Sequence, residues 1–156
     1  MTEKEILIDM RELIDDLKKK VNNNQSVTLK GEGASMLPFI TTEDTLTLTK
    51  PPKRTKTGEI YLYRRSDGSY AIHRVYAVRK DLVFMLGDAQ FFIEKIHKSD
   101  LVAIVTTIKK PDDLVDCTDV WQIIRSVFRM KSRIFKAKFK FLFMRFIRKA
   151  KGLLKK

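Results

Sequence analysis

Six short segments between Val27 and Lys110 constrain the fold of this chain more than any other feature. They are rich in β-branched and aromatic residues, and several alternate apolar with polar side chains, which is typical of strands with one buried face. Turn signals such as Pro51-Pro52 and Ser66-Asp67-Gly68-Ser69 separate them. The segments are 27–29, 45–49, 59–63, 70–78, 82–86 and 101–108. We therefore predict a mainly β domain built as an antiparallel meander.

An amphipathic helix is predicted ahead of the strands. Thr2, with Glu5 three residues later, makes a capping box, and apolar residues then recur at helical spacing until about Asn22. Charged residues occur throughout, and there is neither a long apolar run nor a small-residue cleavage site, so we predict neither a signal peptide nor a membrane span. We expect the helix to pack on the domain or on a second copy of the chain. Binding of a leader peptide is the less favoured alternative.

The composition favours one compact domain with an appendage. A chain of 156 residues with 44% hydrophobic content can bury one core. The single Cys117 excludes an internal disulfide, which predicts a reducing compartment, and neither it nor the two isolated histidines have metal-ligand spacing. We place the boundaries at 1–22 for the helix, 23–112 for the β domain and 113–156 for a helical tail, and we expect no metal and no cofactor.

The net charge of +13 is confined to the tail. Residues 1–120 hold equal numbers of basic and acidic residues, whereas 121–156 hold 13 basic residues and no acid. Net charge reports on partners rather than on fold. We therefore expect the tail, and not the β domain, to have a polyanionic partner.

The tail has the pattern of a long basic amphipathic helix, with a bend or a break into two pieces as an alternative near Lys138 to Phe143. Its longest apolar run, Phe141 to Met144, is far shorter than the ~20 residues that cross a bilayer. Aromatic residues on one side and basic residues on the other are typical of a helix that lies on anionic lipid. We therefore expect residues 119–156 to bind an anionic membrane surface. Docking of the apolar face onto the core or onto a partner ranks second, and binding of nucleic acid ranks last.

Two residues of the β region suggest acyl-transfer chemistry. Ser35 lies in the segment Gly33-Ala34-Ser35-Met36-Leu37-Pro38, where the glycine and proline favour an exposed loop. His73 lies in a predicted strand, from which its imidazole could take the serine proton. His97 has no such partner motif and is expected to be structural.

Four ordered motifs resemble the conserved boxes of type I signal peptidases and their LexA-like relatives. They are Gly33 to Pro38, Gly58-Glu59-Ile60, Ile72-His73-Arg74-Val75 and Leu86-Gly87-Asp88. The resemblance implies a LexA/signal-peptidase-like β core with Ser35 as nucleophile. A histidine before Arg74 is similar to the Ser–His branch of that superfamily, so His73 is the implied base. The backbone N–H of Ser35 is the implied oxyanion donor; many relatives add a hydroxyl at the position that Gly33 occupies here.

The third catalytic residue and the substrate groove are also expectations from the resemblance. Asp88 is the favoured carboxylate to orient His73, and Glu94 is the alternative. The residues expected to contact substrate are Gly33, Met36 and Pro38. Met36 is equally consistent with core packing.

These expectations predict a serine endopeptidase similar to signal peptidase, acting through a Ser–His dyad or Ser–His–Asp triad. Its expected substrate is a protein or leader-peptide precursor at a membrane surface. The expected location is the cytoplasm, peripheral on the inner face of the membrane. The alternative is a catalytically inactive peptidase-like module that binds membrane or a protein partner. The pattern does not predict an oligomeric state.

Overall fold

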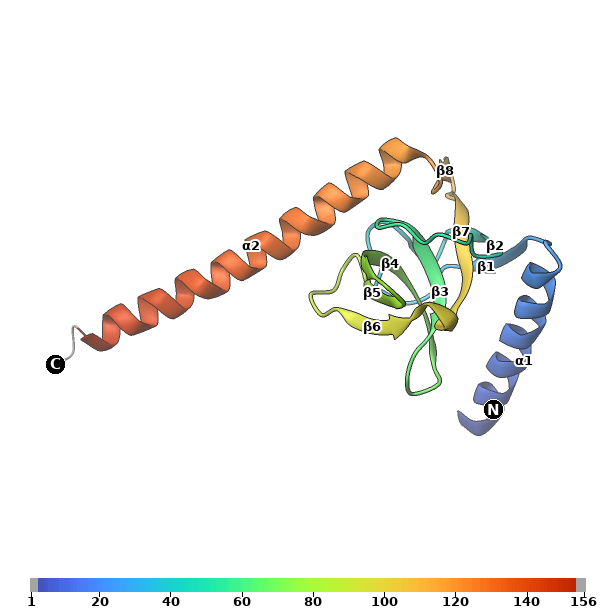
Figure 1. The fold of residues 1–156 in the computed structure, drawn as a ribbon, viewed down its shortest axis with the longest axis horizontal. Helices are drawn as coiled ribbons and strands as arrows, with labels where there is room; N and C mark the ends of the chain where they lie inside the picture. Colours follow the sequence, from blue (N-terminus) through green and yellow to red (C-terminus); the bar gives the residue numbers. More distant parts are fainter. Residues whose placement is uncertain (1–2, 154–156) are drawn as a thin grey trace.

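Eight strands form one curled antiparallel sheet (Figure 1). The computed structural model describes the backbone of residues 3–153 and the side chains of residues 13–136. The strands are β1 (Val27–Lys30), β2 (Thr45–Thr49), β3 (Ile60–Arg64), β4 (Tyr70–Arg79), β5 (Leu82–Leu86), β6 (Glu94–His97), β7 (Leu101–Lys109) and β8 (Leu114–Asp116). The mainly β antiparallel architecture is confirmed. Strands β6 and β8 were not predicted.

The strand order places β3 and β4 inside the sheet. Neighbouring strands follow the order β1-β2-β7-β3-β4-β5-β6, and β8 pairs with β7. Tyr61 of β3 lies opposite His73 of β4 on one side and opposite Ile104 of β7 on the other. On its far edge, β4 pairs with β5 as far as Arg74 opposite Leu86. His73 therefore lies on an interior strand whose backbone is fixed from both sides.

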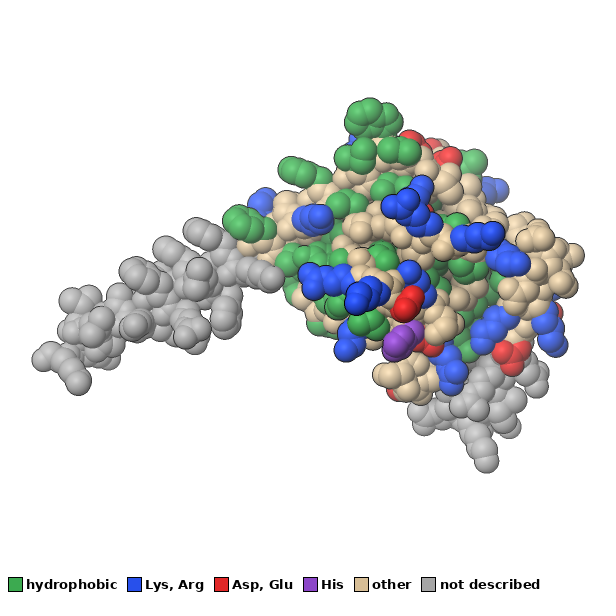
Figure 2. Space-filling model, in the orientation of Figure 1, with side chains coloured by type: hydrophobic (Ala, Val, Ile, Leu, Met, Phe, Trp, Pro, Cys, Tyr) green, Lys and Arg blue, Asp and Glu red, His purple; other side chains and the backbone are tan. Residues whose placement is uncertain are grey.

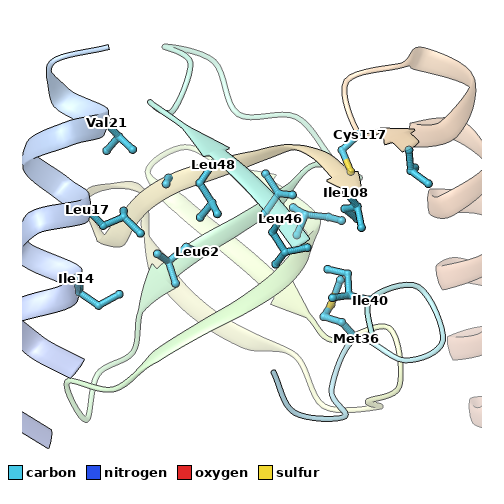
Figure 3. Close-up of a cluster of buried hydrophobic side chains, with 14 residues drawn as sticks. Ile14, Leu17, Val21, Met36, Ile40, Leu46, Leu48, Leu62, Ile108 and Cys117 are labelled. Carbon is cyan, nitrogen blue, oxygen red and sulfur yellow. The ribbon is translucent and has the colours of Figure 1, made fainter. Parts of the chain in front are cut away.

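Helix α1 (Glu3–Asn22) packs on the sheet, where it contacts β1 and β7. Its residues Ile14, Leu17 and Val21 are buried in the main hydrophobic cluster, which also holds Met36 and Leu62 (Figure 3). Fully burying one such side chain contributes roughly 1.5–3 kcal/mol. The core of the domain therefore depends on α1 as well as on the strands.

Helix α2 (Val120–Leu153) is one continuous helix that extends well beyond the sheet (Figure 1). There is no break near residues 138–143, where two pieces were an alternative. Met130 and Ile134 are buried against Leu86, and Ile123 and Val127 lie directly over Gly58. In the part of the chain that the structure describes, neither helix has the run of apolar residues that a membrane span requires.

Candidate active site

Ser35 lies in the loop between β1 and β2, which buried side chains hold in place. Met36 and Ile40 anchor the loop in the main hydrophobic cluster, and the amides of Phe39 and Ile40 donate to the carbonyl of Met36. Asp44 closes the loop by accepting from the Thr41 amide at 2.9 Å. Ser35 itself is half-buried. Its backbone is thus fixed while its side chain stays accessible.

The segment after β5 holds the backbone of Ser35. The Ala89 amide donates to the Ser35 carbonyl at 2.8 Å. A Cβ at Gly87 would lie 2.6 Å from that same oxygen, so only glycine fits there. The same segment also reaches the His-Arg box, because Oδ2 of Asp88 lies 2.7 Å from Nη2 of Arg74, the residue after His73. The serine box, the His-Arg box and the Gly-Asp box therefore meet at one place.

His73 is almost fully buried, with 1% of its surface exposed. Its Nδ1 lies 2.8 Å from the Tyr63 hydroxyl and 3.4 Å from Oε1 of Glu94. Its Nε2 is buried and has no hydrogen-bond partner among the described residues. The Ser35 hydroxyl is therefore not hydrogen-bonded to the imidazole in this structure. Nδ1 therefore has two polar partners, whereas Nε2 has none among the described residues.

Glu94, at the start of β6, is fixed by a two-point contact with Arg65. Arg65 donates to Glu94 through Nε at 2.8 Å and through Nη2 at 2.9 Å. Two-point guanidinium contacts set both the position and the plane of a carboxylate. Sequence analysis missed Tyr63 and Arg65 as members of the site. The alternation of Tyr61 and Tyr63 in the predicted strand was the one signal that pointed toward them.

Burial and neighbouring charges set the protonation of this group. Burial lowers the pKa of His73 below its usual value; Glu94 opposes this shift and Arg65 adds to it. Burial acts to raise the pKa of Glu94, but hydrogen bonds from Arg65 and Tyr63 outweigh it and hold the pKa below its usual value. Near neutral pH the imidazole is therefore neutral and the carboxylate ionised.

Asp88, the favoured partner for His73, is bound elsewhere. Its Oδ2 lies 2.7 Å from Nη2 of Arg74 and its Oδ1 lies 3.0 Å from Nε of the same guanidinium. Arg74 also donates to the Gly58 carbonyl at 2.9 Å. Successive strand residues point to opposite faces, so Arg74 and the imidazole of His73 diverge. The alternative carboxylate, Glu94, is the one that contacts His73.

The other predicted residues occupy three kinds of position. Gly33 is exposed and has a φ of 75°, which glycine adopts without strain. Met36 is only 5% exposed and packs in the core, as its alternative reading had it. Pro38 is exposed and lines a cavity. His97 is exposed at the end of β6, away from the buried imidazole.

No group of three or more His, Cys, Asp or Glu side chains within the described residues is placed to hold a metal ion. Comparison of the chain with protein-family models, with curated proteins and with solved structures finds no match. The geometry of the site and the four sequence motifs are therefore the observations on which a function can be argued.

Proposed function

We propose that this protein is a serine endopeptidase, similar to type I signal peptidases of the Ser–His kind, that cleaves a protein or peptide precursor. The observation that carries the proposal is the way the backbone of Ser35 is held. Its carbonyl accepts from the Ala89 amide and lies against Gly87, in the segment whose Asp88 binds Arg74, next to His73 in the chain. The imidazole of His73 is buried, and its Nε2 has no partner among the described residues. A structural histidine with one nitrogen buried and unsatisfied has a cost, since buried polar atoms are normally paired. A serine hydroxyl or a substrate group would satisfy it.

In this proposal Ser35 attacks the scissile carbonyl while Nε2 of His73 takes the hydroxyl proton. His73 then donates that proton to the leaving amine. For Nε2 to act as a base, Nδ1 must carry the ring hydrogen, and Tyr63 and Glu94 lie where they can accept it. In the proposal, the Ser35 hydroxyl reaches Nε2 of His73 when substrate is bound. Hydrogen bonds of this type are often long before substrate binds.

The oxyanion would be stabilised first by the backbone N–H of Ser35. Within the described chain that N–H makes no hydrogen bond, while the amides of Leu37, Phe39 and Ile40 are used inside the loop. Gly33 adds no hydroxyl there. A second donor would come from another backbone amide or from substrate-bound water, and one such donor is worth roughly a hundredfold or more in rate.

A fluorophosphonate probe tests the peptidase proposal. We expect covalent labelling of the wild-type protein and of a Ser66→Ala control, and none of Ser35→Ala or His73→Gln. Ser66 is an exposed serine in the β3–β4 hairpin, so its removal leaves the site intact. Mass spectrometry of a tryptic digest should place the adduct on Ser35.

The competing function is an inactive peptidase-like module that binds membrane or protein. The observation that favours it is the absence of a hydrogen bond between Ser35 and His73. Folded wild-type protein that takes up no probe, with a circular dichroism spectrum of a β-rich fold, would refute the peptidase and favour this alternative.

The membrane proposal concerns the exposed side of α2. Trp121, Phe128 and Phe135 are 67%, 74% and 70% exposed, and Figure 2 shows apolar side chains projecting along the course of the helix. Exposed Arg125 and Lys131 lie on the same helix. Large exposed apolar groups beside basic residues fit the surface of an anionic bilayer. The predicted basic stretch from 137 onward has its side chains outside the described residues.

Vesicle binding tests the membrane proposal. Deletion of 119–156 would uncover Leu86, so substitutions on the exposed side are the cleaner change. We expect Phe128→Ser with Phe135→Ser to weaken binding to vesicles containing phosphatidylglycerol at least fivefold, since each exposed ring adds apolar area to the contact. Phe92→Ser, an exposed aromatic outside α2, is the control. Unchanged binding of the double variant would contradict the proposal.

A further inference from the structure

A cavity of about 310 Å³ separates the Ser35 loop from α2. Pro38 and Phe39 of the loop form one wall, and Ser126, Arg129 and Arg133 of α2 contribute to the opposite wall. Arg74, Asp88 and Lys110 close it. The cavity therefore joins the segment that carries Ser35 to the part of α2 that docks on the sheet.

Two of the four basic groups in the wall are already neutralised. Arg74 pairs with Asp88 at 2.7 Å and lies over the ring of Phe39, 4.6 Å from its centroid. Lys110 pairs with the buried Asp44 at 2.8 Å. Each of these two pairs has no net charge, so the net charge of the cavity wall depends on the arginines of α2.

Arg129 and Arg133 supply uncompensated positive charge. Arg133 donates through Nη2 to the carbonyls of Gly87 and Gln90, at 3.1 and 2.9 Å, but neither carbonyl carries a formal charge. Its Nε is buried without a hydrogen-bond partner among the described residues. The Arg129 side chain forms no ion pair within that part of the chain. Arg129 is exposed, so the cost of burial falls on Arg133. A half-buried cation without a counterion is costly, and an anion entering the cavity would remove that cost.

We propose that this cavity binds the carboxylate of an acidic side chain in the peptide substrate, close to the scissile bond. The inference rests on the proposed peptidase function and deepens it by naming the substrate class. Arg129 and Arg133 would hold the carboxylate by charge-assisted hydrogen bonds, and the Ser126 hydroxyl stands in the same wall. The cavity is a specificity site, separate from the groups that carry out the chemistry.

The distance from Ser35 fits a peptide. Pro38 is three residues after Ser35, so their Cα atoms are at most about 11 Å apart. An extended substrate covers that distance in about three residues. The cavity is lined by Arg74, which points away from the imidazole of His73, so the acidic residue would bind on the α2 side of the Ser35 loop, three or four positions from the cleaved bond.

A lipid headgroup fits this cavity less well. At 100° per residue, the cavity residues of α2 and its exposed apolar residues Trp121, Ile124, Phe128 and Phe135 lie roughly 160° apart around the helix. A bilayer against the apolar side would thus meet the opposite flank of α2.

The test is direct peptide binding to the Ser35→Ala protein, which needs no turnover. The probes are fluorescein-labelled (Glu-Ala)4-amide and its neutral counterpart (Gln-Ala)4-amide, followed by fluorescence anisotropy. We expect the acidic peptide to bind more tightly than the neutral one, and Arg129→Gln to reduce its affinity about tenfold, as loss of a charge-assisted hydrogen bond predicts. Arg129→Glu should bind (Lys-Ala)4-amide in preference.

Arg125→Gln is the matched control, because Arg125 is exposed on the same helix one turn earlier and does not line the cavity. It should change the affinity less than about twofold, because an exposed charge outside the cavity gains little from a ligand inside it. Equal losses for the two variants, or equal affinity for the acidic and neutral peptides, would overturn the proposal. A loss of phosphatidylglycerol vesicle binding specific to Arg129→Gln, with peptide binding intact, would assign the cavity to a lipid and overturn it also.

The two proposals fail separately. Absence of fluorophosphonate labelling together with acid-selective binding at Arg129 would refute the peptidase chemistry and keep the acidic-ligand site. Labelling of Ser35 without acid-selective binding would keep the peptidase and refute the site.

Discussion

The environment of His73 combines burial, one held nitrogen and one free nitrogen. Tyr63 and Glu94 contact Nδ1, and Arg65 fixes Glu94 from the other side. None of these partners is adjacent to His73 in sequence; the register of β3 with β4 and the short β6 bring them together. The pairing of the strands thus determines which groups can hydrogen-bond to the imidazole.

Burial of neutral His73 predicts a loss of stability in mild acid. Because the folded-state pKa is lowered, the unfolded chain takes up a proton first as the pH falls below about 6.5, which favours unfolding. Between pH 7 and 5.5 we expect the wild-type free energy of unfolding to fall by about 1 kcal/mol more than that of His73→Gln. Urea denaturation at both pH values measures this. An equal fall in both proteins would contradict the burial of a neutral imidazole.

The two carboxylates near the site should differ in their effect on Ser35. Glu94→Gln removes the charge beside Nδ1, and we expect the rate of fluorophosphonate labelling to fall at least about a hundredfold, since replacing an orienting carboxylate by its amide has large effects on such dyads. Asp88→Asn changes the Arg74 pair and should lower the rate less than about tenfold in folded protein. The reverse order of effects would make Asp88 the orienting residue.

At the scale of elements, sequence periodicity predicted most of the sheet but neither short strand. Alternation and turn signals located β1 to β5 and β7 to within about a residue at each end, which is the precision that such signals allow. Strand β6 reads Glu-Lys-Ile-His and β8 is three residues long, so neither carries an apolar pattern. Both exist because a neighbouring strand offers free backbone groups. The Gly-Asp motif likewise could not show which carboxylate reaches His73, since Arg74 and Arg65 decide that.

The apolar pattern of α2 was predicted, but the division of its apolar residues was not. At helical spacing, Val127, Ile134, Trp121 and Phe128 lie on one broad apolar face. Val127 and Ile134 pack against the sheet, whereas Trp121 and Phe128 are exposed. A helical period cannot tell which part of a wide apolar face a neighbouring surface will cover.

Gly58 sets how closely α2 docks on the sheet. A Cβ there would lie 2.7 Å from methyl groups of Ile123 and Val127, and its φ is 96°. We expect Gly58→Ala to lower the free energy of unfolding by roughly 2–4 kcal/mol, from backbone strain together with overpacking. Gly68→Ala is the control, because Gly68 has a φ of 85° and no atom within 4 Å of the added Cβ. Gly68→Ala should lower the free energy of unfolding by about 1 kcal/mol, because it adds backbone strain without overpacking. Thermal or urea unfolding separates the two; equal losses would mean that α2 does not pack here.

At the scale of the whole molecule, one hydrophobic cluster joins α1, the sheet and the Ser35 loop. Leu17 of α1 and Met36, next to Ser35, belong to the same cluster (Figure 3). The conformation of the candidate site therefore depends on the helix at the other end of the core.

Removing one buried side chain of α1 should destabilise the entire domain. Leu17 is 1% exposed, so we expect Leu17→Ala to reduce the free energy of unfolding by about 2–5 kcal/mol. Leu13→Ala is the control, because Leu13 is 47% exposed on the same helix. It should reduce the free energy of unfolding by less than about 1 kcal/mol. Far-ultraviolet circular dichroism and Trp121 fluorescence should report one shared transition. Two separate transitions would show that α1 and α2 unfold independently.

Because α2 is docked on the sheet, it also limits the orientations that the domain can take on a surface to which α2 binds. Its 34 residues extend for about 51 Å, and its first four turns are fixed to the sheet around Gly58 and Leu86. A domain tethered by a flexible linker tumbles freely at the surface that holds it. Here any surface that binds α2 along its length also sets the tilt and the height of the Ser35 loop above that surface. Only chain segments presented at that height and direction would reach Ser35, so geometry of approach would select substrates in addition to their sequence.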